Sequence, residues 1–547
     1  MNTLATTRST GLLTYTSDLL DMSVLPKSIF TFGAGLLTDR MPSQLRRAVI
    51  SDQDKILRKL ISSLALTKQG RNHGITTKMS YNQFAKKVSL CRYDDLIPQI
   101  ERMKQGEADV LWPGQCSLYA ISAGTTASPK NLPVTDAMLQ HFRSAGLKSL
   151  LFYSARAGHA GIFYGRHLIL GGTSNLTTIF ETKDFKAVGG SISGITANRI
   201  PPWVEKHFYE PGSEIARMGD SPEKLTASIA RTRYQDITLM AGIPSSLLIF
   251  AHALREQGST NNNRPDDLQA LWPNLECLVH AGVPIGPYAD ELRKVCGAEV
   301  NFHEIYPASE GFIAAQDGAS TAGLRLITNA GIFYEFIPIN LYDESRLAQL
   351  HDKVVSLADV KIGVDYGLIM TTPSGLCRYV IGDVVRFMST KPPRLVYVGR
   401  TKLQLSACGE HVIEKELTDS LLKVCHQYDW SIVNFHVAPL VANSLTGRGH
   451  GWHEWWIELK PGTLITPRGP FLAVELDAEM RKLNPDYDAK RRSGTLKPPI
   501  VRLLMPGTFE AWMRRNNKWG GQNIMPPCRN DREIADGLAQ IARFTAD

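Results

Sequence analysis

Four short segments of the sequence carry hydroxyl, carboxylate and cationic side chains at spacings that suit a polyphosphate. The first follows an apolar run and reads ISAGTTASPK over residues 121–130. Its small residues let the backbone approach a phosphate, and its hydroxyl and N–H groups can donate hydrogen bonds. A polar turn without a ligand explains the same residues, and the glycine-lysine spacing of a Walker loop is absent. The residues that we select as phosphate ligands are Ser122, Gly124, Thr125, Thr126 and the cation Lys130.

The second segment joins an aromatic ring to a carboxylate and reads YPASEG over residues 306–311. Tyr306 can flank a nucleotide base. Glu310, with Ser309 beside it, can hold a magnesium ion that bridges phosphate oxygens. A turn with a surface glutamate at the end of a strand accounts for the same pattern. The segment predicts one wall of a nucleotide site, with the strand-end turn as the alternative.

Two later segments add a carboxylate and two cations. YVIGD at 379–383 places Asp383 directly after a glycine, where its carboxylate can accept hydrogen bonds from ribose hydroxyls or cap the turn. GRTKLQL at 399–405 contains Arg400 and Lys402, and GEHVIE at 409–414 follows it and ends at Glu414. A hairpin that enters a helix is the structural alternative for this segment. No single segment is decisive, and their order along the chain carries the argument.

The elements that must hold these segments follow from the hydrophobic pattern. Before residue 117, apolar residues recur at three- and four-residue steps, which predicts helices within 45–66 and 81–104. From residue 117, short apolar runs alternate with amphipathic stretches of helical length, which is typical of an α/β sheet. The strands predicted there lie at 117–121, 237–240, 276–280 and 299–303, and a helix covers 244–257.

The pattern changes after residue 366, where consecutive strands are predicted at 368–372, 378–387 and 394–398. A helix with an apolar stripe follows, and then a tail of alternating strands and helices. We therefore predict an α/β protein with a large N-terminal domain of mixed sheets and helices, residues 1–399. A smaller α+β C-terminal domain is predicted over residues 400–547.

Composition excludes several classes of protein. The chain has 547 residues, and its 61 Lys and Arg against 53 Asp and Glu leave a net charge of +8. This charge is mild for the length and forms no basic track, so we expect no nucleic-acid partner. No apolar run approaches the ~18 residues that suggest a membrane-spanning helix. The eight cysteines form no Cys-x-x-Cys pair, which suits reduced thiols. We expect a cytoplasmic protein with no membrane partner.

The order of the four segments resembles that of the adenylate-forming superfamily of acyl and aryl ligases. Longer strings narrow the resemblance: LWPG at 111–114, QDITLMAGIPS at 235–245, LWPNL at 271–275, FYEFIP at 333–338 and LNPDY at 483–487. These strings are typical of the Gretchen Hagen, or auxin-responsive, acyl-acid amido synthetase family. The resemblance extends from residue 70 to residue 523, almost the whole chain.

The resemblance implies a ligase that forms a carbon–nitrogen bond through an acyl-adenylate. Members of the family activate a small carboxylic acid with ATP and Mg²⁺, release pyrophosphate, and pass the acyl group to an amine, usually an amino acid. The catalytic set implied is Lys130, Glu310, Arg400 and Lys402. By the same resemblance Ser122, Thr125 and Thr126 bind phosphates with Lys130 beside them, Tyr306 flanks adenine and Glu310 holds magnesium. Asp383 binds the ribose, Arg400 approaches the ribose or a phosphate, and Lys402 is the hinge of a mobile cap. We expect a monomer or weak dimer.

One string departs from the family pattern. GQNIMPPC at 521–528 stands where the pattern is close to Gln-x-Lys-x-Pro-Arg, so Ile524 and Pro527 replace a lysine and an arginine. The lysine is expected to approach the α-phosphate. Lys518 or Arg529 could replace it, adenylation could be slow, or the protein could perform only part of the reaction.

Two other functions stay open on the sequence. An adenylate-forming ligase could transfer its acyl group to a thiol such as coenzyme A. A nucleotide-binding protein could have lost catalysis, which the residue at position 524 suggests. The sequence does not specify the acid, the amine or the residues of the acyl pocket.

Overall fold

We describe the chain from a computed structural model. The structure describes residues 27–45, 50–122, 130–219, 221–257, 266–283, 285–401, 404–405, 407–408, 410, 412–442, 450–460, 468–516 and 525–542. The selected residues that lie outside this set are Gly124, Thr125, Thr126, Lys402, Lys518 and Ile524.

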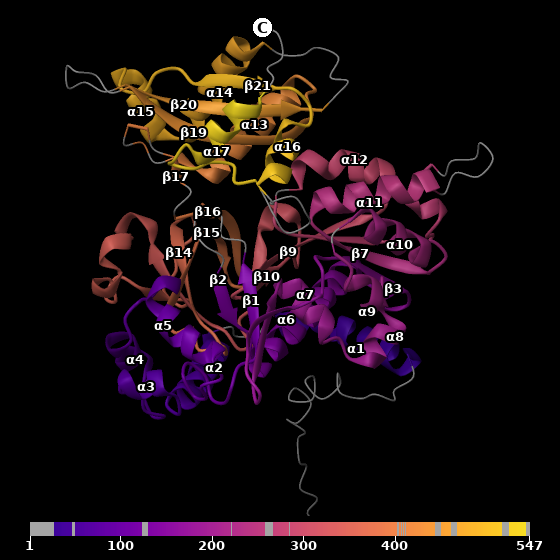
Figure 1. The fold of residues 1–547 in the computed structure, drawn as a ribbon, viewed down its shortest axis with the longest axis vertical. Helices are drawn as coiled ribbons and strands as arrows, with labels where there is room; N and C mark the ends of the chain where they lie inside the picture. Colours follow the sequence, from indigo (N-terminus) through magenta and orange to yellow (C-terminus); the bar gives the residue numbers. More distant parts are fainter. Residues whose placement is uncertain are drawn as a thin grey trace, which may run out of the picture.

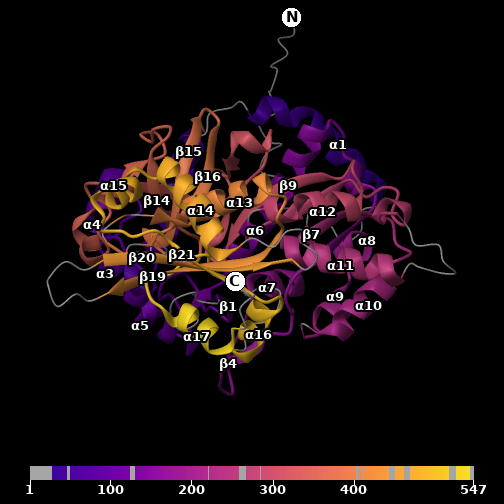
Figure 2. The same ribbon diagram turned by 90° about the horizontal axis from the view of Figure 1, so that it is seen from above.

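Two bodies make up the molecule, a large one and a smaller one that lies against one end of it (Figures 1 and 2). The large body contains the elements from α1 to β16, and the smaller body contains those from β17 onward. The fold class predicted from the sequence is confirmed, because the large body mixes sheets with helices and the smaller one is an α+β unit. No helix among the described residues is long and apolar enough to cross a lipid bilayer.

The first elements of the chain are helical, as predicted. They are α1 (Lys27–Leu45), α2 (Ile50–Leu64), α3 (Lys68–Asn72), α4 (Tyr81–Lys87) and α5 (Tyr93–Lys104). The helical pattern over 81–104 is divided between two helices. The guanidinium of Arg378 donates to the carbonyl oxygens of Ala85 (2.6 Å) and Val88 (2.9 Å), so a distant side chain satisfies the C-terminal end of α4.

A twelve-stranded sheet runs through the large body in the order β13-β12-β14-β15-β16-β11-β10-β9-β8-β7-β3-β6. The half from β9 to β6 is parallel, and the half from β13 to β9 is antiparallel. The strands are β3 (Arg166–Leu170), β6 (Tyr209–Glu210), β7 (Ile237–Gly242), β8 (Cys277–His280), β9 (Asn301–Ala308), β10 (Gly311–Ala315), β11 (Leu324–Leu326), β12 (Phe333–Pro338), β13 (Val355–Ser356), β14 (Asp365–Thr371), β15 (Tyr379–Thr390) and β16 (Pro393–Arg400). The three strands predicted after residue 366 correspond to β14, β15 and β16 and belong to the antiparallel half.

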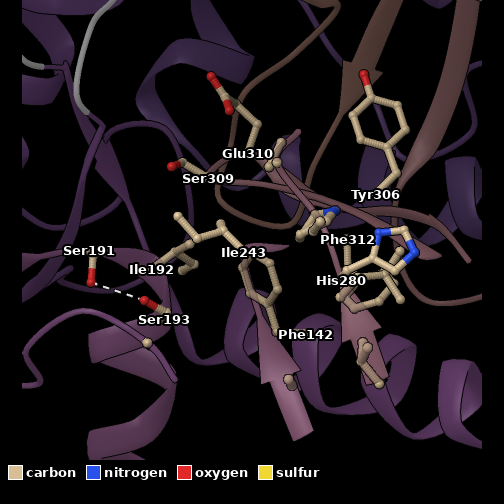
Figure 3. A pocket seen from close by; sticks show the side chains of 18 of the residues that line it. Phe142, Ser191, Ile192, Ser193, Ile243, His280, Tyr306, Ser309, Glu310 and Phe312 are labelled. Carbon is tan, nitrogen blue, oxygen red and sulfur yellow. Dashed lines mark hydrogen bonds between the residues drawn. The ribbon is translucent and has the colours of Figure 1, made fainter. Parts of the chain in front are cut away.

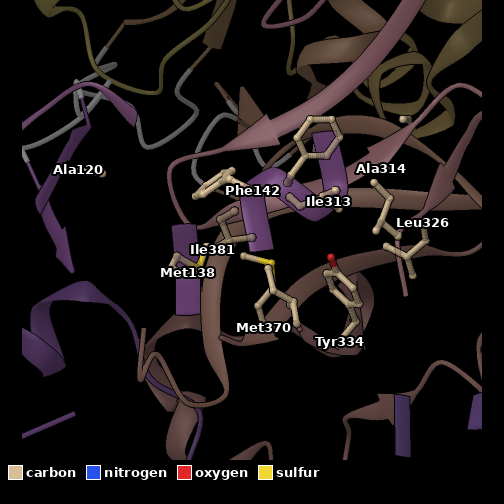
Figure 4. Packing of buried hydrophobic residues seen from close by; sticks show 14 of the residues in the cluster. Ala120, Met138, Phe142, Ile313, Ala314, Leu326, Tyr334, Met370 and Ile381 are labelled. Carbon is tan, nitrogen blue, oxygen red and sulfur yellow. The ribbon is translucent and has the colours of Figure 1, made fainter. Parts of the chain in front are cut away.

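A second, four-stranded sheet and seven helices complete the large body. The sheet order is β2 (Lys130–Pro133), β1 (Leu118–Ser122), β5 (Lys186–Gly190) and β4 (Thr177–Glu181). The helices are α6 (Asp136–Ala157), α7 (Ile192–Asn198), α8 (Pro202–His207), α9 (Ser213–Ala216), α10 (Pro222–Thr232), α11 (Pro244–Gln257) and α12 (Gly286–Cys296). Helix α6 packs on β10, and its side chains Met138 and Phe142 join Ile313, Met370 and Ile381 in the main core (Figure 4).

The smaller body is built on a three-stranded sheet in the order β19-β20-β21. The strands of that sheet are β19 (Ile432–Ala442), β20 (His450–Leu459) and β21 (Ile500–Leu504), and a separate two-stranded sheet consists of β17 (Gln404–Leu405) and β18 (Val412–Ile413). The helices of the smaller body are α13 (Glu414–Gln427), α14 (Gly469–Leu483), α15 (Pro485–Ser493), α16 (Thr508–Arg515) and α17 (Glu533–Ile541). Trp455 and Trp456 are buried in different clusters because neighbouring strand residues point to opposite faces.

Candidate active site

A cavity of about 1200 Å³ opens between the two bodies. Residues of the large body form most of its wall, and α13, α16 and the chain around Met525 close it from the smaller body. It is lined by every selected nucleotide-site residue that the structure describes: Ser122, Lys130, Tyr306, Ser309, Glu310, Asp383 and Arg400. Figure 3 shows Ser309, Glu310 and Tyr306 along one side of it. Segments far apart in the sequence therefore meet at one place.

Asp383 is held between Tyr306 and Arg400. The preceding Gly382 takes a φ of +92°, a conformation that glycine adopts at low cost. Asp383 on β15 pairs in register with Arg400 on β16, and Arg400 Nε lies 3.2 Å from Asp383 Oδ1. The Tyr306 hydroxyl donates to Asp383 Oδ2 at 2.5 Å. Burial, reinforced by the Asp383 charge, raises the pKa of Tyr306, so the hydroxyl stays protonated and keeps donating.

Tyr306 lies inside β9, which extends to Ala308, and so the turn to β10 begins later than predicted. The ring of Tyr306 meets that of Tyr397 edge to face, with centroids 5.7 Å apart. The strand therefore fixes the ring in the cavity wall, and the turn that follows carries Ser309 and Glu310.

Glu310 is buried, with 8% of its surface exposed. The Tyr379 hydroxyl donates to Glu310 Oε1 at 3.5 Å, and Lys130 Nζ donates to the Tyr379 hydroxyl at 3.4 Å. Burial raises the pKa of Glu310, and the charge of Lys130 opposes this effect. A buried carboxylate with such long contacts is suited to a divalent cation. The described residues contain no cluster of three His, Cys, Asp or Glu side chains that could hold a metal ion.

The rest of the cavity wall is largely apolar. It is formed by α6, α7 and α8 and by the ends of β7 and β8, through Phe142, Leu147, Leu150, Ile192, Trp203, Phe208, Leu239 and Val279. Helix α6 contributes one face, because residues three or four positions apart project to the same side. This part of the cavity can receive an uncharged organic group next to the polar part.

His280, which was not predicted from the sequence, lies in the cavity wall at the end of β8 (Figure 3). Only 3% of its surface is exposed, and Nδ1 has no hydrogen-bond partner among the residues that the structure describes. Burial lowers its pKa to about 4, so the imidazole is neutral near pH 7. His280 ends an apolar run that predicts a strand. Only its being a histidine could have indicated a functional residue there.

Glu414 and Tyr397 also line the cavity and were not selected. Of the two cations considered as substitutes for the lysine, Arg529 is buried and paired with Asp531 (2.6 Å) and Glu533 (3.1 Å) in the smaller body. Those ion pairs do not favour Arg529 as the cation that approaches a phosphate.

The fold is that of an adenylate-forming enzyme. A 2-hydroxyisobutyryl-CoA ligase in its postadenylation state superimposes with a TM-score of 0.56 at 12% identity, over 90% of this chain and 91% of that one. The GH3.15 acyl acid amido synthetase in complex with 2,4-DB superimposes with a TM-score of 0.73 at 17% identity, over 93% and 97% of the two chains.

Three models of the GH3 family match the chain: the N-terminal domain over residues 42–230, the central domain over 325–400 and the C-terminal domain over 415–533. The probable indole-3-acetic acid-amido synthetase GH3.1 of Oryza sativa subsp. japonica is 32% identical, over 84% of each chain. The jasmonoyl–L-amino acid synthetase GH3.5 of the same organism is 22% identical, over 85% of this chain and 89% of its own. The chain belongs to the GH3 family, which confirms the resemblance found in the sequence.

Proposed function

We propose that this protein is an ATP-dependent acyl-acid amido synthetase. It adenylates a small carboxylic acid and transfers the acyl group to an amine, with amino acids as the first class to test. The observation that carries the proposal is the meeting of Lys130, Glu310 and the Asp383 pair in one cavity of a GH3-family chain. The names of its relatives, an indole-3-acetic acid-amido synthetase and a jasmonoyl–L-amino acid synthetase, support an amide product.

In the proposed site, ATP lies along the polar part of the cavity. Asp383 accepts hydrogen bonds from the ribose hydroxyls, Tyr306 flanks the adenine, and Arg400 approaches the ribose or phosphate. Ser122, Ser309 and Lys130 act at the phosphates together with Gly124, Thr125 and Thr126 of the adjoining loop. The carboxylic acid places its body in the apolar part, so its carboxylate points toward the phosphates.

Adenylation then needs no covalent nucleophile from the protein. The acid's own carboxylate attacks the α-phosphate, and the protein must orient the two groups and neutralise the charge on the leaving pyrophosphate. Lys130 supplies a positive charge on that side of the cavity. A magnesium ion, which Glu310 would hold, supplies further neutralisation of phosphate oxygens when bound.

The smaller body serves the second half-reaction in this proposal. A mixed anhydride is open to hydrolysis, and a cap over the cavity excludes water. We assign residues 1–399 to the nucleotide- and acyl-binding domain and 400–547 to a mobile cap, with Lys402 at the hinge. A cytoplasmic monomer or weak dimer completes the proposal.

Pyrophosphate exchange tests it. Unaltered protein, ATP, Mg²⁺ and labelled pyrophosphate are incubated with a panel of carboxylic acids, and label should enter ATP only when a suitable acid is present. Adding amino acids should then yield an amide and AMP. No exchange with any acid, despite measurable ATP binding, would contradict the proposal and favour a protein that has lost catalysis.

The same assay tests the thioester alternative. This alternative is transfer of the acyl group to coenzyme A, and it is tested because the fold is similar to that of a CoA ligase. Replacing the amino acids by coenzyme A should give no thioester. A thioester formed faster than the amide would instead assign the protein to the acyl-thioester ligases.

A further inference from the structure

Glu414 begins α13 of the smaller body and lies in the wall of the cavity. It is half-buried and lies close to the side chains of Tyr397, Arg400 and Asp383. The adjoining backbone approaches closely, since a Cβ on Gly399 would meet Glu414 Cβ at 3.4 Å. Glu414 therefore lies against the large body where β16 ends, beside the proposed ribose site.

Charged and titratable groups surround Glu414 on several elements. They are Asp383 on β15, Tyr397 and Arg400 on β16, Lys415 on its own helix, and Cys528 in the chain before α17. Burial raises the pKa of Glu414 to about 7; the charge of Arg400 opposes the rise and that of Asp383 adds to it. Near neutral pH the group can therefore both accept and release a proton.

Several other carboxylates and imidazoles in or near the described cavity wall are less suited to accept a proton. Burial lowers the pKa of both His167 and His280 to about 4, which makes them weak bases. Asp383 is paired with Arg400, and Glu310 is the proposed magnesium ligand. The nearby Glu416 is occupied by the backbone N–H of Ile413 at the start of α13.

Amide formation releases protons that some group must accept. The acceptor arrives as an ammonium ion and loses one proton to water before it can attack. The neutral nitrogen then forms a bond to the carbonyl carbon, and this nitrogen must lose a second proton. The bond from the carbonyl carbon to the phosphate oxygen breaks, and its electron pair leaves with AMP.

We propose that Glu414 accepts this second proton from the attacking nitrogen and later releases it to water. The inference rests on the proposed amide synthetase function. Glu414 lines the same cavity as Lys130 and Glu310. It lies beside Asp383 and Arg400, next to the proposed ribose, whose 5′ end carries the reactive phosphate. The cap thus contributes a catalytic group in addition to excluding water.

The test compares Glu414→Gln with the unaltered protein in each half-reaction. Gln keeps the size of the side chain and one carbonyl oxygen but accepts no proton. We expect amide formation with an amino acid to fall by about 100-fold or more, the usual range for loss of a general base. Pyrophosphate exchange should stay within about threefold, since adenylation does not use the carboxylate.

Two further measurements distinguish a proton acceptor from a structural residue. In the unaltered protein the amide-forming rate should rise with pH through about 7, because Glu414 acts only when ionised, and the variant should lack this limb. Hydroxylamine is uncharged near neutral pH and its adduct gives up a proton readily to water. It should therefore form hydroxamate at similar rates with both proteins.

Asp419→Asn is the matched control. Asp419 lies on the same helix and the same cavity wall, is exposed, and pairs with Lys415. This variant should keep both half-reactions. Equal losses in exchange and amide formation for Glu414→Gln, or an equal loss with hydroxylamine, would overturn the proposal. Failure of the proposed function itself would be seen separately, as absence of exchange in the unaltered protein.

Discussion

Asp383 combines several interactions that a ribose-binding carboxylate requires. Its neighbours Tyr306 and Arg400 fix both oxygens, and the glycine before it allows the bend that turns the side chain into the cavity. A carboxylate held in this way loses little conformational freedom when it accepts hydrogen bonds from a ligand. We therefore expect that replacing the Asp383 carboxylate weakens the binding of ATP.

Asp383→Asn should raise the KM for ATP in pyrophosphate exchange by roughly 10- to 100-fold, because hydrogen bonds to a charged group contribute about 1.5–3 kcal/mol. Asp365→Asn is the control. Asp365 also pairs with an arginine between neighbouring strands, Arg386 at 2.6 Å, but it lies outside the cavity. An ATP KM that rises equally in both variants would argue against a role of Asp383 at the ribose.

At the scale of elements, one buried ion pair joins parts of the large body that are distant in sequence. Arg378 and Glu335 are almost fully buried and in contact at 3.0 Å, which links the start of β15 to β12. The same guanidinium donates a hydrogen bond to the carbonyl oxygen of Ala85 near the end of α4, 293 positions away in the chain. Tyr81 at the start of α4 adds a hydrogen bond to Glu335 at 3.0 Å.

Arg378→Met should lower the free energy of unfolding by about 3–5 kcal/mol, since it leaves a buried carboxylate without its cation. The midpoint of chemical denaturation measures this change. Arg386→Met removes a half-exposed pair and should cost no more than about 1 kcal/mol. Adding Glu335→Gln to Arg378→Met should recover part of the loss. No recovery would mean that the lost packing and backbone contacts, and not the unpaired charge, dominate the cost.

At the scale of the whole molecule, an ion pair connects the two bodies. Glu291 on α12 pairs with Lys460, which follows β20 of the smaller body, and also contacts His252 Nε2 at 2.9 Å. A Cβ on Gly286 at the start of α12 would meet Leu422 of α13 at 3.5 Å. These contacts hold the arrangement in which Glu414 faces the cavity.

Lys460→Glu should therefore disfavour this arrangement, because it places two carboxylates together. We expect amide formation to slow about fivefold, the size of an effect near 1 kcal/mol for a partly exposed pair. Pyrophosphate exchange should change less. The charge-swapped pair Glu291→Lys with Lys460→Glu should restore the rate. Equal slowing of both half-reactions, without restoration by the swap, would contradict a specific role for this contact.

Much of the fold could be predicted because hydrophobic periodicity is a local property. The strands after residue 366 and the helix over 244–257 are examples. The division of 81–104 into two helices was not predicted, and the guanidinium that satisfies the end of α4 belongs to Arg378, 293 positions from Ala85 in the chain. Tyr306, Glu310, Asp383 and Arg400 could be selected as candidates because each lies in a short polar segment of the sequence, although Tyr306, Asp383 and Arg400 lie within strands. His280 was not selected because it ends an apolar run. Glu414 ends the polar segment 409–414 but was given no role, because the groups that surround it come from other elements.

The sequence by itself determined the residue types and their order, and this order was sufficient to indicate the family and the reaction class. Only the tertiary structure decided which side chains act together. It paired Asp383 with Arg400 across two strands, buried Glu310 beside Tyr379, and brought Glu414 from the smaller body to the same cavity. The physical reason is that burial and charge pairing, which set the proton affinity of a carboxylate, depend on neighbours that only folding brings together.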